Sequence, residues 1–196
     1  MSRSTSLSLL VVASALAVGC ADPPTAPTAS APTGFASAAH GTGRDAFGFN
    51  GTVSGFPTGA VRLTGGGAYD VSTASNTLGA ETFVHSGGGF DCVASIAQGP
   101  LTGCAAGEGV RWDTAQLLAS TTFKCTGAAT EVAKPAVTDD DTVVLLADFY
   151  RAGDGIDESF TAQMIVSATD IAPDIEGDQT LWVQGVGCGT AIANFN

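Results

Sequence analysis

Residues 142–150 read TVVLLADFY, and residues 160–168 read FTAQMIVSA. The first stretch is apolar at almost every position, which is typical of a strand that is buried on both faces. In the second stretch the even-numbered positions from Phe160 to Val166 are apolar, whereas Thr161 and Gln163 are polar. Such alternation places one set of side chains on one face of a strand. Together the two stretches predict an all-β fold.

Segments around this pair extend the same pattern. Further strand-like segments lie at residues 46–53, 59–63, 68–72, 82–85, 90–96, 121–125 and 181–186. Residues 114–119 (TAQLLA) have helical character and Asp113 is suited to cap them, so we expect one short helix at 113–119. Many short strands, glycine-rich turns and one short helix indicate a β-sandwich or jelly-roll-like architecture, with a small β-barrel as the alternative.

Two glycine triplets, at residues 65–67 and 87–89, stand between strand-like segments. The surrounding sequences LTGGGAYD and HSGGGFD are alike, and we interpret both triplets as hairpin turns. A phosphate-binding loop is excluded, because no Gly-Lys-Ser/Thr follows and no helix is expected after either triplet.

Residues 1–19 have the features of an export signal. Arg3 supplies a positive charge, and an apolar run follows from about Leu7 to Val18. At roughly 12 residues this run is too short to span a bilayer, which needs about 20 residues. A charged start, a short apolar middle and small residues at the end are typical of a secretory signal.

Cys20 ends the segment Leu16-Ala17-Val18-Gly19-Cys20. This segment resembles a bacterial lipoprotein signal, in which the cysteine becomes the acylated N-terminus of the mature protein. The resemblance implies cleavage after Gly19 and a diacylglyceryl group on the Cys20 sulfur, although Ala17 stands where such signals usually carry leucine. Two or more acyl chains hold a protein stably on a membrane. The alternative is a plain signal peptide that is cut after Ala17.

The residues that follow Cys20 divide into a tether and a domain. Residues 21–43 are mostly Pro, Ala, Thr, Ser and Gly, and such a composition lacks the apolar bulk that a core requires. We therefore expect residues 20–44 to form a disordered tether behind the lipidated cysteine. Residues 45–196 are long enough for one globular domain of ordinary size.

The chain has five cysteines, and setting Cys20 aside leaves an even number. An even set suits an oxidising compartment, and no Cys-x-x-Cys motif suggests redox or zinc chemistry. Four cysteines allow three pairings. We favour Cys92–Cys104, which closes a local loop around Gln98-Gly99-Pro100, and this choice leaves Cys125 and Cys188 to link two strands.

The charge balance is strongly acidic, with 19 acidic and 7 basic side chains and a formal net charge of −12. Residues 139–178 alone contain eleven acids and one base, Arg151. This balance argues against nucleic acid and anionic membrane surfaces as partners. A solvated acidic surface that keeps an exported protein soluble is the simpler interpretation.

Catalytic motifs find little support. A serine hydrolase needs a histidine base, and of the two histidines His40 lies in the tether, so a triad would rest on His85. No Gly-x-Ser-x-Gly motif is present. Cys188 lies in Gly185-Val-Gly-Cys-Gly189, which we interpret as close strand packing rather than as a thiol nucleophile. The Trp and Tyr residues are too scattered along the chain to predict a sugar-stacking platform.

One acidic turn could hold a metal ion. Residues 152–158 read AGDGIDE, and Asp154, Asp157 and Glu158 offer the hard oxygen ligands that Ca²⁺ prefers. The spacing is not that of an EF-hand loop, and a solvated hairpin turn is the alternative.

The sequence as a whole predicts a lipid-anchored extracytoplasmic β-domain that faces the periplasm or the cell exterior. Its expected role is non-catalytic, either binding a protein or glycan partner or serving the structure of the envelope. The alternative is a secreted hydrolase that uses carboxylates, with bound calcium.

Overall fold

The computed structural model describes residues 43–151 and 158–196. Within these ranges the regular structure consists of β-strands and one turn of 3-10 helix, η1 (Val71–Thr73). No helix in the described ranges is long and apolar enough to cross a bilayer. The strands are β1 (Asp45–Gly55), β2 (Ala60–Tyr69), β3 (Val84–Ala94), β4 (Arg111–Leu118), β5 (Ser120–Phe123), β6 (Lys134–Val137), β7 (Thr142–Arg151), β8 (Glu158–Ser167), β9 (Leu181–Val183), β10 (Gly187–Gly189) and β11 (Ala191–Phe195).

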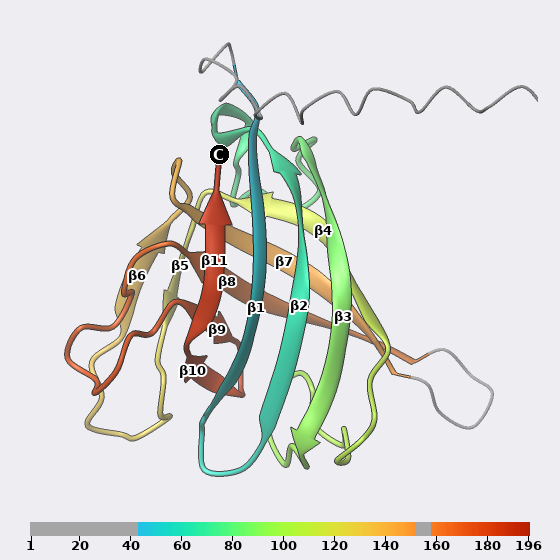
Figure 1. Cartoon of the computed structure of the whole chain (residues 1–196), viewed down its shortest axis with the longest axis vertical. Helices are drawn as coiled ribbons and strands as arrows, with labels where there is room; N and C mark the ends of the chain where they lie inside the picture. The colour runs from blue at the N-terminus through green and yellow to red at the C-terminus, as the bar shows by residue number, and fades with distance from the viewer. Residues whose placement is uncertain (1–42, 152–157) are drawn as a thin grey trace, which may run out of the picture. The chain divides into compact units, whose positions relative to one another are not determined.

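Nine of these strands form one antiparallel sheet, in the order β10-β9-β8-β7-β4-β3-β2-β1-β11. β10 also pairs with β1, where Ser54 lies opposite Cys188, so the sheet closes on itself. Figure 1 shows β1, β2 and β3 side by side in front, with β7 and β8 crossing behind them. The expectation of an all-β, sandwich-like fold is confirmed, and the β1–β10 pairing makes the two layers continuous.

The main core lies between these two layers. Every second residue of β7, from Val143 to Phe149, points into it, and these side chains are fully buried. The even-numbered residues of β8 do the same, as the alternation in the sequence predicts: Ala162, Met164 and Val166 are fully buried and Phe160 packs against them. The core also holds a group of rings, in which Trp112 lies 5.8 Å from Phe49, centroid to centroid.

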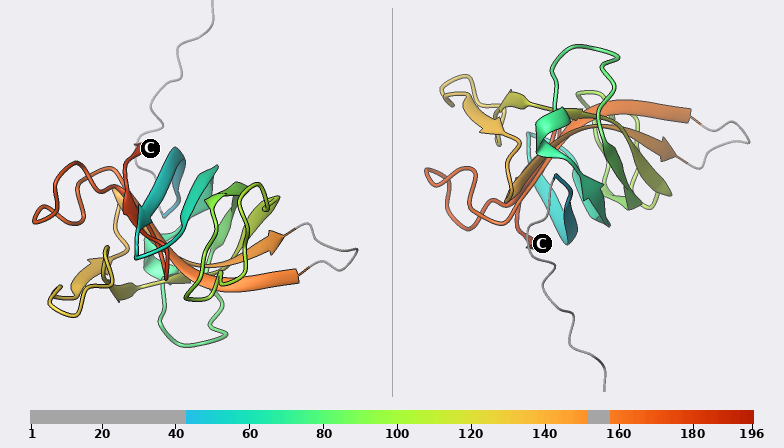
Figure 2. Two further views of the ribbon diagram at one scale, coloured as in Figure 1. Left: turned by 90° about the horizontal axis from the view of Figure 1, so that it is seen from below. Right: turned by 90° about the horizontal axis from the view of Figure 1, so that it is seen from above.

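A second, smaller core lies on the outer face of the β7–β8 layer. The hairpin of β5 and β6 packs there, with Phe123 against Trp182 of β9 at 5.5 Å between ring centroids. Both views in Figure 2 show this hairpin on the side of β7 and β8 that faces away from β1 and β2. Val144 belongs to this outer core and Leu146 packs against it. The apolar run at 142–150 therefore covers both faces of one strand, because each face meets a different core.

The predicted helix at 113–119 is wrong, because these residues form most of β4. Strand pairing puts Trp112 and Leu117 in the main core and Leu118 in the outer core. A six-residue helix is marginal by itself, so the burial of these side chains decides the structure. Asp113 caps no helix; it lies opposite Asp148 of β7 and 3.4 Å from the Arg111 side chain.

The interpretation of the glycine triplets as turns is also wrong. Both triplets lie inside strands, β2 and β3, and they pair with each other: Gly65 opposite Gly88 and Gly66 opposite Gly87. The reason lies in the core, since a Cβ atom on Gly65 would come within 2.4 Å of the Trp112 ring. The buried Trp112 side chain, which donates a hydrogen bond from Nε1 to the Thr64 carbonyl oxygen (3.0 Å), occupies that space.

Candidate functional site

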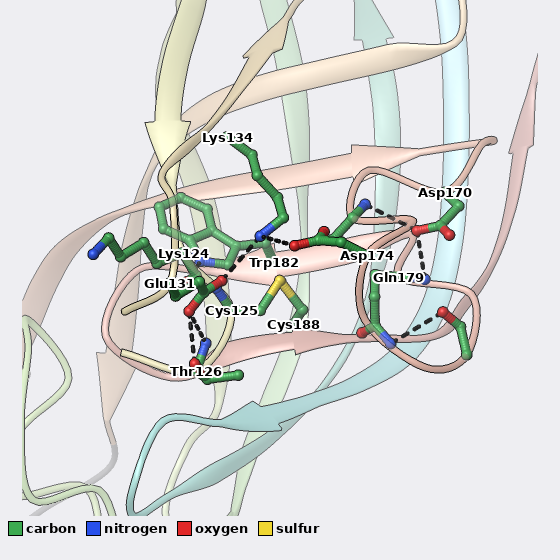
Figure 3. The surroundings of a disulfide bond; sticks show 12 residues. Lys124, Cys125, Thr126, Glu131, Lys134, Asp170, Asp174, Gln179, Trp182 and Cys188 are labelled. Atoms are coloured by element: carbon green, nitrogen blue, oxygen red, sulfur yellow. Dashed lines mark hydrogen bonds and ion pairs between the residues drawn. A yellow bond between two sulfur atoms is a disulfide. The ribbon is translucent and has the colours of Figure 1, made fainter. Parts of the chain in front are cut away.

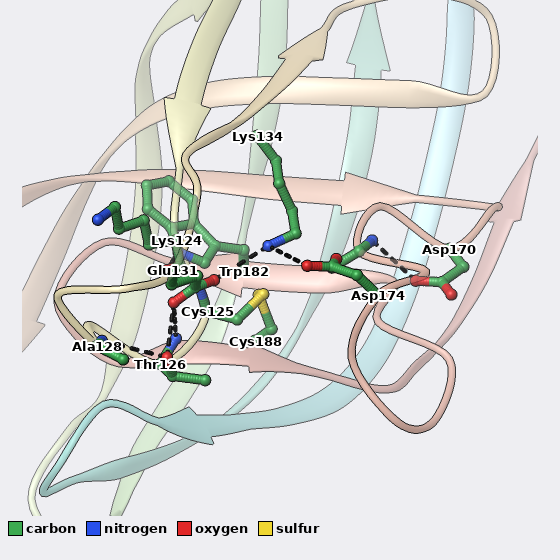
Figure 4. A network of polar contacts seen from close by, with 11 residues as sticks. Lys124, Cys125, Thr126, Ala128, Glu131, Lys134, Asp170, Asp174, Trp182 and Cys188 are labelled. Carbon is green, nitrogen blue, oxygen red and sulfur yellow. Dashed lines mark hydrogen bonds and ion pairs between the residues drawn. A yellow bond between two sulfur atoms is a disulfide. The ribbon is translucent and has the colours of Figure 1, made fainter.

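Two charged side chains are largely buried beside a disulfide: Glu131, in the loop between β5 and β6, and Lys134, at the start of β6. Glu131 has a side chain only 8% exposed. One carboxylate oxygen accepts from the Cys125 backbone N–H (2.7 Å), and the other accepts from the N–H and the hydroxyl of Thr126 (2.8 and 2.7 Å). Lys134 adds a fourth donor at 3.2 Å. Figure 4 shows these bonds converging on the Glu131 carboxylate, which leaves it fully engaged by the protein.

These contacts fix the protonation of both charged groups. Burial opposes ionisation of Glu131, but the hydrogen bonds from Thr126, Cys125 and Lys134 outweigh it and lower the pKa of the carboxyl to about 2. Burial likewise acts against the charged form of Lys134, yet Asp174 and Glu131 raise the pKa of the ammonium group above its ordinary value. Both groups therefore stay charged far on either side of neutral pH.

Lys134 extends the network to a second loop, between β8 and β9. Its Nζ atom lies 3.1 Å from the carboxylate of Asp174. Within that loop Asp170 accepts from the backbone N–H groups of Ala172 (2.9 Å) and Gln179 (3.1 Å). Figure 3 shows Lys134 and the β8–β9 loop meeting at this ion pair. Because Lys134 begins β6 and Asp174 lies in the β8–β9 loop, the ion pair ties the β5–β6 hairpin to that loop.

The disulfide Cys125–Cys188 lies next to this network and joins the chain after β5 to β10. Trp182 covers the same region and donates from Nε1 to the Lys124 carbonyl oxygen at 2.9 Å. A disulfide, a ring and a saturated ion-pair network thus hold the β5–β6 hairpin on the outer core. We assign this cluster, residues 124–134 with Asp174, Trp182 and Cys188, to stabilising the fold and name it the hairpin clamp.

The second disulfide, Cys92–Cys104, closes the loop that follows β3. The structure therefore contains both of the bonds favoured from the sequence, and each of the four cysteines in the described ranges is paired. Gly187 and Gly189 fit the expected close packing around Cys188, since a Cβ atom on either would lie about 2 Å from a β1 carbonyl oxygen (2.0 Å to Ser54 and 1.9 Å to Thr52).

Several glycines of β1, β2 and β3 face away from the main core, on the outer face of these strands. Gly48, Gly66 and Gly87 lie in one row across the three strands, and the row continues into Asp113 and Asp148. In the neighbouring row the guanidinium of Arg111 lies 4.4 Å above the Tyr150 ring. A flat strip of backbone thus adjoins a group of polar and aromatic side chains.

Internal packing accounts for only part of this strip. A Cβ atom on Gly66 would come within 2.3 Å of the Phe47 carbonyl oxygen, and one on Gly87 within 2.8 Å of the Asp113 carboxylate. On Gly48 and Gly89, by contrast, the nearest atoms would be at 3.9 and 3.6 Å, which is ordinary contact. Nothing in the fold requires glycine at positions 48 and 89.

The other residues singled out from the sequence are placed as follows. His85 is exposed on β3, where its ring meets the ring of Phe83 edge to face at 5.2 Å. Cys20, Asp154 and Asp157 lie outside the described residues, and of Glu158 only the backbone, at the start of β8, is described. The calcium and lipidation hypotheses therefore remain predictions. In the described ranges no group of three or more His, Cys, Asp or Glu side chains is arranged to hold a metal ion.

Sequence reasoning paired Cys125 with Cys188 but missed the ion-pair network of the hairpin clamp. The available signal was the pair Glu131 and Lys134 at a spacing of three, in a chain with only 7 basic residues. The pairing of the glycine triplets had a signal too, namely the likeness of LTGGGAYD and HSGGGFD. Comparison with known proteins adds nothing to these assignments: no family model, no curated protein and no solved structure matches the chain.

Proposed function

We propose that the chain is an exported, lipid-anchored protein whose β-domain has a non-catalytic role, binding a partner at the cell envelope. The observation that carries this proposal is the use of the cysteines. Four of the five are consumed in two disulfides within the domain, which leaves Cys20 with no cysteine partner in this chain.

The disulfides indicate an oxidising, extracytoplasmic location, because such bonds persist there and are rare in the cytosol. Cys20 in turn stands at the end of the segment that resembles a lipoprotein signal, where a cysteine is needed as an acylation site rather than for pairing. Cys20 stands 23 positions before the first described residue, Gly43.

The directions of the pKa shifts at Glu131, Lys134 and Tyr69 fit structural roles for these three groups. A general acid or base works best with a pKa near the operating pH. Glu131 is shifted down and Lys134 up, so both move away from neutrality. Burial, assisted by the nearby carboxylates of Asp45 and Asp139, raises the pKa of the Tyr69 hydroxyl, which donates to the backbone at Asp139 (2.9 Å). All three shifts favour fixed structural contacts over proton transfer.

The test is membrane attachment of the full-length chain with a fatty-acid label. We expect the wild-type protein to incorporate the label and to enter the detergent phase on phase separation. Cys20→Ser should abolish both, whereas the matched variant Ala17→Leu, which supplies the usual leucine, should retain both. If Cys20→Ser still carries label and remains in the membrane fraction, the proposed anchor is wrong.

A further inference from the structure

The loop between β2 and β3 presents one large apolar side chain to solvent. Residues 71–83 make up this loop, here called the Leu78 loop, and Leu78 is 86% exposed. The loop closes at its base, where the Asp70 N–H donates to the Phe83 carbonyl oxygen (3.1 Å). Figure 2 shows it, in blue-green, projecting past β5 in both views. An isolated exposed leucine needs no explanation, so the argument depends on how this one is held.

The backbone on both sides of Leu78 is fixed by one buried side chain. Gln116 of β4, only 4% exposed, donates from Nε2 to the carbonyl oxygens of Ser75 (2.7 Å) and Thr77 (2.9 Å). Its Oε1 accepts from the Gly79 N–H at 3.3 Å. A register shift in β4 at Ala115 precedes Gln116, and a shift of this kind changes the direction in which the following side chains point.

Further bonds attach the loop to the start of β5. Asn76 and Ser120 form two hydrogen bonds: the Asn76 amide donates to the Ser120 hydroxyl (3.0 Å), and its carbonyl accepts from the Ser120 N–H (3.1 Å). The Ser75 N–H donates to the Leu117 carbonyl oxygen at 3.1 Å. Ser120 lies opposite Val137 of β6, which is 57% exposed. The backbone that carries the exposed Leu78 side chain is therefore held in place by hydrogen bonds on both sides.

The charges around the loop are mainly acidic. Glu81 is exposed within the loop and Asp70 precedes it. The exposed turn Asp139-Asp140-Asp141 is joined to the base of the loop, because the Tyr69 hydroxyl donates to the carbonyl oxygens of Asp139 and Asp140 (2.9 and 3.1 Å). One basic residue, Arg44, lies against the loop: its guanidinium is 4.1 Å from the centroid of the Phe83 ring.

We propose that the Leu78 loop is the contact element for a partner protein, which offers an apolar pocket for Leu78 within a surface rich in Lys and Arg. A rigid loop binds with little ordering cost, and burial of the exposed leucine in a partner's pocket removes its apolar surface from water. The acidic surroundings favour a basic protein surface and disfavour an anionic lipid surface. The assignment deepens the proposed function, since it names the surface through which the anchored domain binds.

The experiment uses the full-length protein in the cells that make it, with a photoreactive residue at one site at a time. Leu78→p-benzoylphenylalanine is compared with Ile192→p-benzoylphenylalanine on β11, where the native side chain is 77% exposed. We expect a discrete protein adduct from position 78 alone, with the linked segment of the partner rich in Lys and Arg. Raising the salt from 0.05 to about 0.5 M should reduce its yield, since exposed charges are screened within a few ångströms at high salt.

Two variants without the photoreactive residue complete the design. Each is tested as a competitor for the partner, and the decrease in adduct yield measures how well it competes. Leu78→Ser should compete at least ten-fold more weakly, the loss expected when the burial of one leucine is removed, with no change in melting temperature because the side chain is exposed. Gln116→Leu keeps Leu78 but should compete more weakly and speed amide exchange at residues 75–79. Adducts with lipid or with a second copy of the chain, equal yields at positions 78 and 192, no adduct, or a yield indifferent to salt would overturn the proposal. If the Leu78 loop fails these tests while Cys20 is acylated, only the proposed contact surface is wrong. If Cys20 is not acylated but position 78 gives the expected adduct, only the proposed lipid anchor is wrong.

Discussion

The glycine-rich strands allow one substitution to be tried at two positions with opposite expected results. At Gly65 a new methyl group would meet the Trp112 ring at 2.4 Å and the Gly87 carbonyl oxygen at 2.6 Å. The ring has no free space to enter, because Trp112 is fully buried and its Nε1 is bonded to Thr64. At Gly89 the nearest atoms to the same methyl group would be 3.6 and 3.7 Å away.

Gly65→Ala should therefore destabilise the domain. Overpacking a filled core costs about 1–3 kcal/mol, and shifting Trp112 weakens a hydrogen bond of about 1 kcal/mol. The lower chain entropy of alanine in the unfolded state offsets roughly 0.4–1 kcal/mol. The net loss is about 2 kcal/mol, which for a domain of this size lowers Tm by about 4–8 °C.

Gly89→Ala also lowers the chain entropy of the unfolded state but introduces no clash in the folded state, so its Tm should rise by about 1–3 °C. Thermal unfolding of residues 43–196, followed by circular dichroism with disulfides intact, measures both variants under the same conditions. If Gly65→Ala proved neutral, or if the two variants shifted Tm equally, the packing of Trp112 against Gly65 would not be the reason for glycine at position 65.

Three further predictions concern the hairpin clamp, the two disulfides and the acidic segment at residues 152–158. Glu131→Gln should cost about 3 kcal/mol at pH 7, because folding lowers the pKa of this carboxyl from 4.5 to about 2. The contribution is present above the unfolded value near 4.5 and is lost as pH falls toward 2, so equal pH profiles of denaturant unfolding for variant and wild type would contradict the assignment. Removing Cys125–Cys188, which spans 63 residues, should lower the free energy of unfolding by about 4 kcal/mol, whereas removing Cys92–Cys104, which spans 12, should lower it by about 3 kcal/mol, since the entropy of loop closure grows with length. Urea unfolding of the two double Cys→Ser variants shows which loss is larger. The reverse order would show that chain entropy does not dominate. Calcium at the acidic turn predicts that chelation lowers Tm, and that Asp154→Asn with Asp157→Asn removes the effect; an unchanged Tm on chelation would rule the site out.

The burial of β7 and β8 could be predicted from the sequence, because each face of these strands meets one kind of environment. The alternation from Phe160 to Val166 predicts the inward face of β8, and the unbroken apolar run of β7 indicates cover on both sides. The disulfide pairing was accessible for a similar reason, since Cys92 and Cys104 are joined by a short, turn-rich loop.

The features that could not be predicted depend on contacts between distant parts of the chain. The local sequence TAQLLA favours a helix, and only the pairing of β4 with β3 and β7, which buries Trp112, reverses that preference. A glycine triplet suggests a turn from the sequence alone, and only the packing of the Trp112 ring against Gly65 and of backbone atoms against Gly66 and Gly67 shows that it lies within a strand. The link from Lys134 to Asp174 and the contact of Gln116 with Ser75 join residues about 40 positions apart, and no local pattern records them.

The central claim, that this domain is held at an envelope membrane through Cys20, is tested most directly by the mass of the N-terminal peptide of the mature protein. The account predicts a peptide that begins at Cys20 and carries a diacylglyceryl group on its sulfur. A peptide that begins at Val18, or one that contains Cys20 without a lipid, would contradict it.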